Sequence, residues 1–303
     1  MKIYAWKGDI SNFGDDLNEW LWKQLFDNID DADTSCCLVG IGSILTRELV
    51  AELNSYKRKI VFGTGVRPSI KHPVLLSKLK LDKNWDVEFL RGPLSANYLD
   101  NKYEYITDAA YAIRQLKHFE NYVQAPKKYE ISFMPYFGSL KYFDWEKFCN
   151  DSGFHYISPL SEQGVEYTIK EIAASKKIIT EAMHGAIVAD ALRIPWQRFI
   201  FSTYYNEYSY ISEFKWSDWL LSLQMTHVEP VKNHFYTGNN MINFIKDKTQ
   251  RVGSKTIFNQ RIFLEPLLQR LEKNKNYYCS DNLLIHDIDS KIAKKIDDVK
   301  KSF

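Results

Sequence analysis

The chain has few cysteines, no long apolar run and almost no net charge. Its four cysteines never form a Cys-x-x-Cys pair, which argues against a zinc or redox site of that type. No stretch approaches the ~18 apolar residues of a membrane-spanning helix, and the N-terminus lacks the apolar core of a signal peptide. A formal net charge of +2 argues against a nucleic-acid-binding protein that works through overall charge.

What the chain does contain is typical of a soluble globular protein. Hydrophobic residues make up 45% and charged residues 26%, and 303 residues are enough for two domains of ordinary size. Aromatic residues reach 15%. Tyrosine and tryptophan fill cores, and they also line sugar and ligand sites, so composition alone leaves both roles open.

The order of strand-like and helix-like segments predicts an α/β fold. KIYAWK at residues 2–7 and KIVFGTGV at 59–66 are strand-like, and DDLNEWLWKQLF at 15–26 has the spacing of an amphipathic helix. A further helix is predicted over 68–80. Strands that alternate with helices in this way form right-handed βαβ units and a mostly parallel sheet. Ligands bind such sheets beyond the carboxyl ends of the strands, where this chain has several glycine turns.

The same alternation starts again after a polar segment at residues 115–128. We therefore predict two α/β domains, over residues 1–118 and 126–225, followed by a helical region over 226–303 that packs on both. The glycine turns contain no G-x-G-x-x-G or Walker motif, so the sequence carries no nucleotide-binding fingerprint.

One histidine lies in an otherwise apolar stretch, TEAMHGAIVADALRIP at residues 180–195. The pattern predicts a strand over 176–180 and a helix over 185–193, which places His184 at the helix N-terminus. Free N–H groups at that end attract carboxylate or phosphate. A histidine there can transfer a proton to a bound anion or to a reacting carbon, and Glu181 could orient its imidazole. The alternative is a hydrogen-bonded structural histidine.

Several segments in a fixed order resemble one known family. They are NFGDDLN at 12–18, GIGSIL at 40–45, FGTGV at 62–66, LRGPLSANYL at 90–99, ITDAAY at 106–111, EAMHGAIVADALRIPW at 181–196 and FKWSDWLLSL at 214–223. Together they resemble the polysaccharide pyruvyltransferase family, in its bacterial exopolysaccharide and capsule branch. The resemblance extends over roughly residues 1–225, and it rests on the order and spacing of the segments rather than on one motif.

This resemblance implies a fold similar to GT-B glycosyltransferases, in which two Rossmann-like domains face a cleft, with helices added at the C-terminus. It also implies that phosphoenolpyruvate donates its enolpyruvyl group to two hydroxyls of a sugar or lipid-linked oligosaccharide, which gives a pyruvate ketal and phosphate. No cofactor, metal or nucleic-acid partner is expected. The location implied is the cytoplasm, with peripheral association at the inner membrane as an option.

His184 matches the family's histidine, so the resemblance gives it the role of general acid. Its neighbours Met183 and Gly185 are expected to line the donor site, with Gly185 leaving room for a ligand. Many members have arginine where this chain has Ala182, so the donor's negative charge needs another cation. Arg91 is the first candidate, because it follows a strand within a matching segment, and an ion pair is its alternative role. The other candidates are Arg67, Lys215 and Arg198.

The turn before the first helix is expected to bind the acceptor. Asp15 or Asp16 either contacts the sugar hydroxyls or serves the helix start, with Asp15 as its N-cap. Asp108, expected at the end of the first domain's last strand, either faces the cleft or closes the hinge region. The predicted acceptor-binding residues are Asn12, Gly14, Asp15, Asp16, Gly42 and Thr64.

Two other functions stay open from the sequence. A GT-B glycosyltransferase that uses a nucleotide sugar would share the fold, but many of those enzymes carry a Glu-x7-Glu pair, and that spacing does not occur in the second predicted domain. A non-catalytic glycan-binding module would also keep the fold, and it would tolerate the loss of His184.

Overall fold

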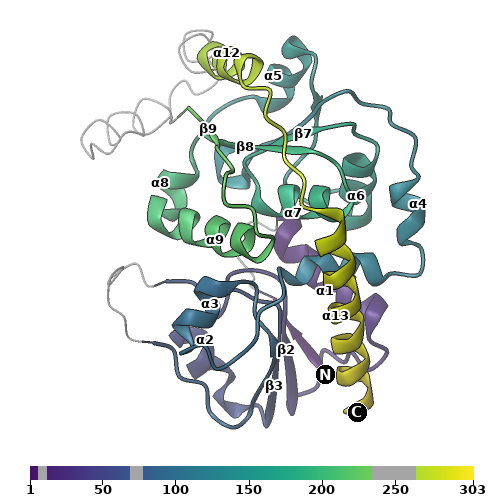
Figure 1. The fold of residues 1–303 in the computed structure, drawn as a ribbon, viewed down its shortest axis with the longest axis vertical. Coiled ribbons are helices and arrows are strands. Elements are labelled where there is room, and N and C mark those ends of the chain that lie inside the picture. Colours follow the sequence, from purple (N-terminus) through teal and green to yellow (C-terminus); the bar gives the residue numbers. More distant parts are fainter. Residues whose placement is uncertain (6–11, 69–77, 234–263) are drawn as a thin grey trace. The chain divides into compact units, whose positions relative to one another are not determined.

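The structure, a computed structural model, describes residues 1–5, 12–68, 78–233 and 264–303. The chain forms two compact units, whose elements are labelled in Figure 1. Unit 1 comprises Met1–Asn121, Glu213–His227 and Ser280–Phe303, and unit 2 comprises Tyr122–Ser212 and Val228–Cys279. Neither unit is therefore a single continuous stretch of sequence.

Unit 1 is built on a four-stranded parallel sheet in the order β1-β2-β3-β4. The strands are β1 (Lys2–Tyr4), β2 (Cys36–Val39), β3 (Arg58–Phe62) and β4 (Trp85–Phe89). Every residue of β2 is buried, as expected for a parallel strand that is covered on both faces. The helices of the unit are α1 (Phe13–Leu25), α2 (Arg47–Glu52), α3 (Pro93–Tyr98), α13 (Asn282–Lys301) and the 3-10 helices η1 (Leu53–Ser55) and η2 (Ala109–Gln115).

These helices cover the two faces of the unit 1 sheet. Side chains from α2 and α3 share a hydrophobic core with Val39 and Val61 of the sheet. On the opposite face, Trp22 of α1 contacts Phe62, with ring centroids 5.3 Å apart. The amphipathic spacing of α1 and the alternation of apolar residues along the strands therefore account for the layers of this unit.

Helix α13 belongs to unit 1 although it lies far along the chain. Arg114 of η2 makes two 2.8 Å hydrogen bonds to the carboxylate of Asp289. The buried side chains of α13 recur every three or four residues, which defines one helix face. They are Ile285, Ile288, Ile292, Ile296 and Val299.

Unit 2 is built on a five-stranded parallel sheet in the order β6-β5-β7-β8-β9. The strands are β5 (Ser132–Met134), β6 (His155–Tyr156), β7 (Ile178–Thr180), β8 (Trp196–Ile200) and β9 (Val231–Lys232). The helices are α5 (Trp145–Ser152), α6 (Val165–Ala173), α7 (Met183–Ala191), α8 (Thr203–Glu207), α12 (Glu265–Lys273) and the 3-10 helix η3 (Phe137–Ser139). Two further helices, α4 (Phe119–Val123) and α9 (Ser209–Ser222), contain residues of both units.

An aromatic core covers one face of the unit 2 sheet. Phe133 of β5 and Phe199 of β8 have ring centroids 4.7 Å apart, and Trp145 of α5 and side chains of α12 complete the core. Helix α7 packs on β5 and β7, where a Cβ atom at Gly185 would come within 2.7 Å of Met134 Sδ. The absent side chain of Gly185 allows this close approach of helix and sheet.

The predicted parallel α/β organisation is confirmed, but the segments are divided differently. Residues 213–227 and 280–303 belong to unit 1, whereas the predicted boundaries put them in the second domain and in a C-terminal helical region. That helical region also contains the edge strand β9, which pairs with β8 through Phe199 and Val231. The helix predicted over 68–80 falls mostly outside the described residues. Among the helices that the structure describes, none has the length and apolar character needed to span a membrane.

A buried carboxylate fastens α9 to unit 1. One oxygen of Asp218 accepts the backbone N–H of Ser95 at 2.9 Å, and the other accepts the Ser95 hydroxyl at 2.6 Å and Nε of Arg91 at 3.0 Å. The side chains of Arg91 and Asp218 are 1% and 0% exposed. A Cβ at Gly92 would lie 1.9 Å from the carbonyl oxygen of Asp218, so glycine is required there. The segments LRGPLSANYL and FKWSDWLLSL are thus held together by one buried hydrogen-bond network around Asp218.

Replacement of Asp218 by asparagine should destabilise the chain strongly. The change keeps the side-chain volume but leaves the buried guanidinium of Arg91 without its counter-charge, which costs about 3–5 kcal/mol. Urea denaturation followed by circular dichroism measures the loss. Asp86→Asn is the matched control, because Asp86 pairs with Arg58 while 46% exposed. The control should change the free energy of unfolding by less than about 1 kcal/mol, and equal effects of the two substitutions would contradict the assignment.

Candidate functional site

His184 lies in the first turn of α7, directly after β7, as the sequence predicted. The helix begins at Met183, two residues earlier than predicted, and Ala182 is its N-cap in an extended conformation. An alanine side chain cannot accept a hydrogen bond, so it leaves the first N–H groups of α7 without a side-chain cap. His184 is half-buried and Met183 is buried. The arrangement combines a proton-transferring group with the positive end of a helix.

Glu181 holds the loops around this helix start. Its Oε1 atom accepts the backbone N–H groups of Phe201, Ser202 and Thr203 at 2.8–2.9 Å, and the Thr203 hydroxyl at 2.5 Å. Its Oε2 atom accepts the Ser139 hydroxyl at 2.6 Å. The side chain is buried. The ends of β7 and β8 and the loop after β5 are therefore tied to a single carboxylate.

These contacts give Glu181 a structural role, in place of the orientation of the His184 imidazole considered from the sequence. Both carboxylate oxygens are directed at the loops that follow β5 and β8, and the three consecutive N–H groups at the start of α8 already bind an anion, the glutamate itself. These N–H groups are therefore occupied within the protein, whereas the start of α7 has no side-chain cap.

Gly185 has a packing reason beside the predicted ligand-binding one. A Cβ there would come within 2.7 Å of both Met134 Sδ and Thr180 Oγ1. The Thr180 hydroxyl donates to the carbonyl of Ala182 at 2.9 Å, which fixes the turn that precedes His184. The close contact of α7 with β5 and β7 thus positions the histidine.

Among the candidate cations, Arg198 shares unit 2 with His184. It lies on β8 opposite Thr180, the last residue of β7, and is 3% exposed. Arg67 is exposed and Lys215 is half-buried, and both belong to unit 1. Arg67 and Lys215 stay predictions for the donor site.

Arg91 forms a buried ion pair, which was the alternative to a role in donor binding. Its guanidinium is bound by Asp218 and by the Ser43 hydroxyl at 2.5 Å, inside unit 1. A Cβ at Gly65 would lie 2.2 Å from its Cζ atom, so the group is enclosed by backbone as well. A guanidinium that is 1% exposed cannot reach a ligand unless this packing opens. The preference for Arg91 as the donor cation is corrected accordingly.

The turn before α1 is capped by Asn12 and not by Asp15. Asn12 has an extended backbone, and its Oδ1 accepts the N–H of Asp15 at 3.3 Å, while its Nδ2 donates to the Asp15 carboxylate at 2.5 Å. Asp15 and Asp16 lie half-buried in the first turn of the helix, and Gly14 is buried. The N-cap alternative for Asp15 is therefore wrong, and contact of this turn with the acceptor stays a prediction.

The two glycine turns after β2 and β3 are bonded to each other. The carbonyl of Gly42 accepts the Thr64 hydroxyl and the N–H of Gly65, both at 2.9 Å. Thr64 is fully buried. Gly42 has a φ of +116°, which favours glycine. The structure thus gives Gly42 and Thr64 a structural role, and acceptor binding by them stays a prediction.

Asp108 follows an isolated bridge between Leu90 and Tyr105 and not the predicted strand. It caps η2, where its Oδ1 accepts the N–H of Ala110 at 3.0 Å. The residue is fully buried, and this burial raises the pKa of its carboxyl to about 6, against the opposing influence of Arg91. Its position favours the structural one of the two roles considered for it.

No metal site is found in the part of the chain that the structure describes. None of its His, Cys, Asp and Glu side chains gather in a group of three or more that could hold an ion.

The sequence did not reveal the structural roles of Glu181, considered only as a residue that could orient His184, and of Asp218. Each is an acidic residue inside a mostly apolar stretch, IITEAM and KWSDWLL. A charge in such a stretch is buried only where donors surround it. The sequence therefore indicated that these carboxylates are surrounded by hydrogen-bond donors, but it did not indicate which residues supply the donors.

Comparison with known proteins places the chain among polysaccharide-synthesis proteins. It is 35% identical over 232 residues to the succinoglycan biosynthesis protein ExoV of Rhizobium meliloti (strain 1021). The match covers 75% of this chain and 66% of ExoV, so the chain spans just under two thirds of that relative.

Similarity to solved structures is weaker. A Klebsiella pneumoniae protein of uncharacterized function, KP1_0663, has a TM-score of 0.42 and 13% identity, with 76% of this chain and 92% of that chain covered. The wall teichoic acid polymerase TagF has a TM-score of 0.36 and 10% identity, with 98% and 88% covered. Neither likeness carries an argument about how the two units are arranged.

The fold and site define an α/β protein of two parallel-sheet units, one of which holds a histidine at the start of a helix. The sequence profile of polysaccharide pyruvyl transferases matches residues 5–196, which include His184 and most of both sheets. The chain belongs to the polysaccharide pyruvyl transferase family. The resemblance inferred from the sequence is confirmed.

Removal of the Glu181 carboxylate should loosen unit 2. In Glu181→Ala the N–H groups of residues 201–203 lose a buried acceptor, which costs about 3 kcal/mol or more. Thermal and urea denaturation measure the effect. Glu130→Gln is the control, because the side chain of Glu130 is 70% exposed and pairs with Lys176. That variant should stay within about 0.5 kcal/mol of the parent, and a Glu181→Ala protein of parental stability would overturn the role described here.

Asp108 should make stability depend on pH. Its folded-state pKa of about 6 lies above the ordinary value of 3.8, so the folded chain holds the proton that the unfolded chain releases between these pH values. The free energy of unfolding should therefore fall as pH rises from 4 to 6, by up to about 3 kcal/mol, and then level off. The Asp108→Asn protein should lack this component. Urea denaturation of both proteins across this pH range tests it, and parallel curves would contradict it.

Proposed function

We propose that this chain is a ketal-pyruvyltransferase. It moves the enolpyruvyl group of phosphoenolpyruvate onto two hydroxyls of a sugar in a bacterial exopolysaccharide, capsule or lipid-linked oligosaccharide precursor. Family membership supports the transferase class, and the similarity to a succinoglycan biosynthesis protein supports a polysaccharide acceptor. The observation that carries the proposal is His184 in the first turn of α7, inside the segment that matches the family.

In the proposed reaction His184 acts as general acid. Its imidazolium donates a proton to the methylene carbon of phosphoenolpyruvate, which makes the central carbon electrophilic. One sugar hydroxyl adds to that carbon, and the second displaces phosphate and closes the ring. Two carbon–oxygen bonds form, the bond to the phosphate oxygen breaks, and each turnover gives one ketal and one phosphate.

The surroundings of His184 suit an anionic donor. The first N–H groups of α7 supply hydrogen-bond donors and a partial positive charge for carboxylate or phosphate. Arg198 lies on β8 next to the end of β7 in the same unit, but at 3% exposed it is enclosed much as Arg91 is, so we assign the donor's charge to the N–H groups at the start of α7. Glu181 holds this region rigid through backbone contacts, which favours a defined distance between acid and donor.

The remaining parts of the proposal concern the arrangement of the units and the acceptor. In the proposal, the two parallel-sheet units are the two Rossmann-like domains that the family resemblance implies. The acceptor site is assigned to unit 1, at the start of α1, where Asp15 and Asp16 lie half-buried. The enzyme works in the cytoplasm, at the membrane surface when its acceptor is lipid-linked.

The proposal predicts phosphate release that depends on both substrates. Purified protein should release phosphate from phosphoenolpyruvate only when a suitable glycan is present, and mass spectrometry should detect the mass gain of a ketal on that glycan. His184→Ala should abolish the release because the proton donor is gone. His286→Ala, which removes an exposed histidine on α13, should retain it.

Two results would overturn the proposal at different levels. Full turnover by His184→Ala would end the general-acid assignment while keeping the reaction. Turnover with a nucleotide sugar and none with phosphoenolpyruvate would replace the reaction by glycosyl transfer. Circular dichroism of both histidine variants checks that a loss of activity is not a loss of folding.

A further inference from the structure

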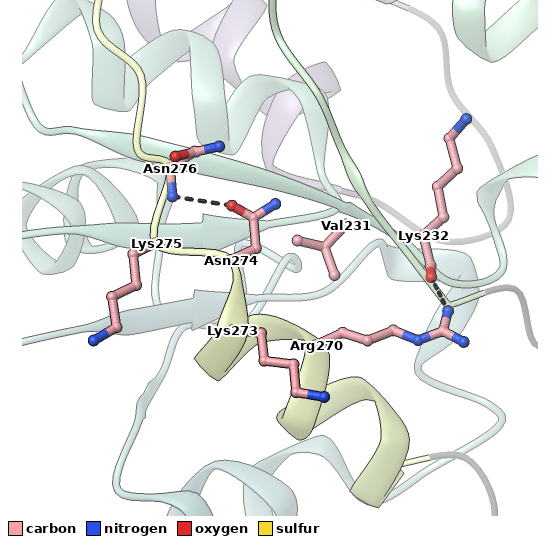
Figure 2. Close-up of a pocket in the computed structure, with 7 residues that line it drawn as sticks. All are labelled: Val231, Lys232, Arg270, Lys273, Asn274, Lys275 and Asn276. Atoms are coloured by element: carbon pink, nitrogen blue, oxygen red, sulfur yellow. Dashed lines mark hydrogen bonds between the residues drawn. The ribbon is translucent and has the colours of Figure 1, made fainter.

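A pocket of about 440 Å³ lies in unit 2, between the edge strand β9 and the C-terminal end of α12 (Figure 2). Its volume is within the range of small-molecule sites. The residues that line it are Val231, Lys232, Arg270, Lys273, Asn274, Lys275 and Asn276. All of them lie beyond residue 196, where the match to the family ends.

Among the residues that the structure describes, the lining of the pocket carries four positive charges and no negative one. Within the described part of the chain, none of the four cations forms an ion pair. The chain as a whole has a net charge of only +2, so this is a strong local excess. All four side chains are exposed, so these charges are accessible to an anion from solvent.

Hydrogen bonds hold the centre of the pocket in place. Arg270 donates to the carbonyl of Lys232, which links α12 to β9. The carbonyl of Asn274 accepts Gln197 Nε2 at 2.7 Å, and its side-chain oxygen accepts the N–H of Asn276 at 3.0 Å. Figure 2 shows Arg270 and Lys273 extending from α12 toward the same side, while Lys232 and Lys275 point away at opposite ends.

The helix dipole explains only part of this clustering. Cations in the last turn of a helix stabilise it by about 0.3–1 kcal/mol each, which accounts for Arg270 and Lys273. It does not account for Lys232, which lies on β9, or for Lys275, which follows the helix. The helix dipole thus does not account for the four cations together, which come from β9, α12 and the segment after α12.

We propose that this pocket binds a phosphate-bearing anion. The two central cations match a group with two negative charges, and Lys232 and Lys275 extend the positive surface on either side for a diphosphate or a longer phosphate ester. A single carboxylate would neutralise only one of the central charges. The described residues of the lining include no aromatic side chain on which a base could stack, and their positive charges favour phosphate. The proposal is independent of His184 and of the pyruvyl-transfer reaction.

Titration calorimetry of the full chain with inorganic pyrophosphate tests the proposal. We expect saturable binding that weakens at higher ionic strength, and at least about tenfold weaker binding in the double variant Arg270→Gln/Lys273→Gln. Lys273→Gln/Lys275→Gln should give a similar loss, and it leaves the Arg270–Lys232 hydrogen bond in place, so a folding defect is separable. His184→Ala should bind as the parent does.

Lys147→Gln/Lys170→Gln is the matched control. These lysines lie on α5 and α6 of the same unit, are 54% and 61% exposed, and are each paired with a carboxylate one helical turn away. The control removes the same charge from unit 2 as the pocket variants do. Its pyrophosphate affinity should equal that of the parent.

A second arm identifies the source of the phosphate. Co-sedimentation is measured with vesicles of phosphatidylglycerol, and with vesicles of phosphatidylcholine for comparison. Pocket-dependent binding to phosphatidylglycerol without affinity for pyrophosphate would assign the site to a lipid headgroup, and the reverse would assign it to a free phosphate compound. Absence of binding in both arms, or an equal loss in the control variant, would overturn the proposal.

Discussion

Both units depend on a buried carboxylate that accepts hydrogen bonds from backbone and side chains at the carboxyl ends of the strands. In unit 2 Glu181 binds the N–H groups that open α8, and in unit 1 Asp218 binds the N–H of Ser95 near the start of α3. Loops at strand ends expose polar backbone groups that must be satisfied when buried. Removal of either carboxylate would leave several buried donors, from backbone and side chains, without an acceptor at once.

In unit 2 this constraint bears on the candidate site, because Glu181 directly precedes the N-cap of the helix that carries His184. Helix α7 is apolar along most of its length and buried against β5 and β7, so its first turn has little freedom. General acid catalysis requires a donor that is held at the correct distance from the reacting carbon. The packing at Gly185 and the anchored loops after β5 and β8 supply that rigidity. The apolar environment of His184 therefore fits its proposed role as a proton donor.

The sequence was sufficient for features that are set locally. Alternating strands and helices predicted the parallel sheets, and a proline after the apolar run located α7 within two residues. Features set by distant partners could not be predicted in the same way. Arg91 and Asp218 are 127 positions apart, and neither segment indicates that the other is its partner.

The dependence on distant or three-dimensional contacts also explains the wrong N-cap of α1 and the missed basic pocket. At the start of α1, Asn12 and Asp15 are both good capping residues, and only the extended backbone of Asn12 decides between them. The basic pocket was missed because its residues come from β9 and α12, which the chain separates by more than thirty positions. Each of its lysines, taken alone, resembles an ordinary surface lysine.

The division of unit 1 among distant parts of the chain has a consequence for its biosynthesis. Its sheet is complete by Phe89 and η2 by Gln115, but α13, which pairs with η2 through Asp289, is made only after all of unit 2. At ribosomal speeds of about 5–20 residues per second the interval is roughly ten to thirty seconds. During that time the surface that α13 will cover is exposed on the nascent chain. Unit 1 is thus the first to be started and the last to be finished.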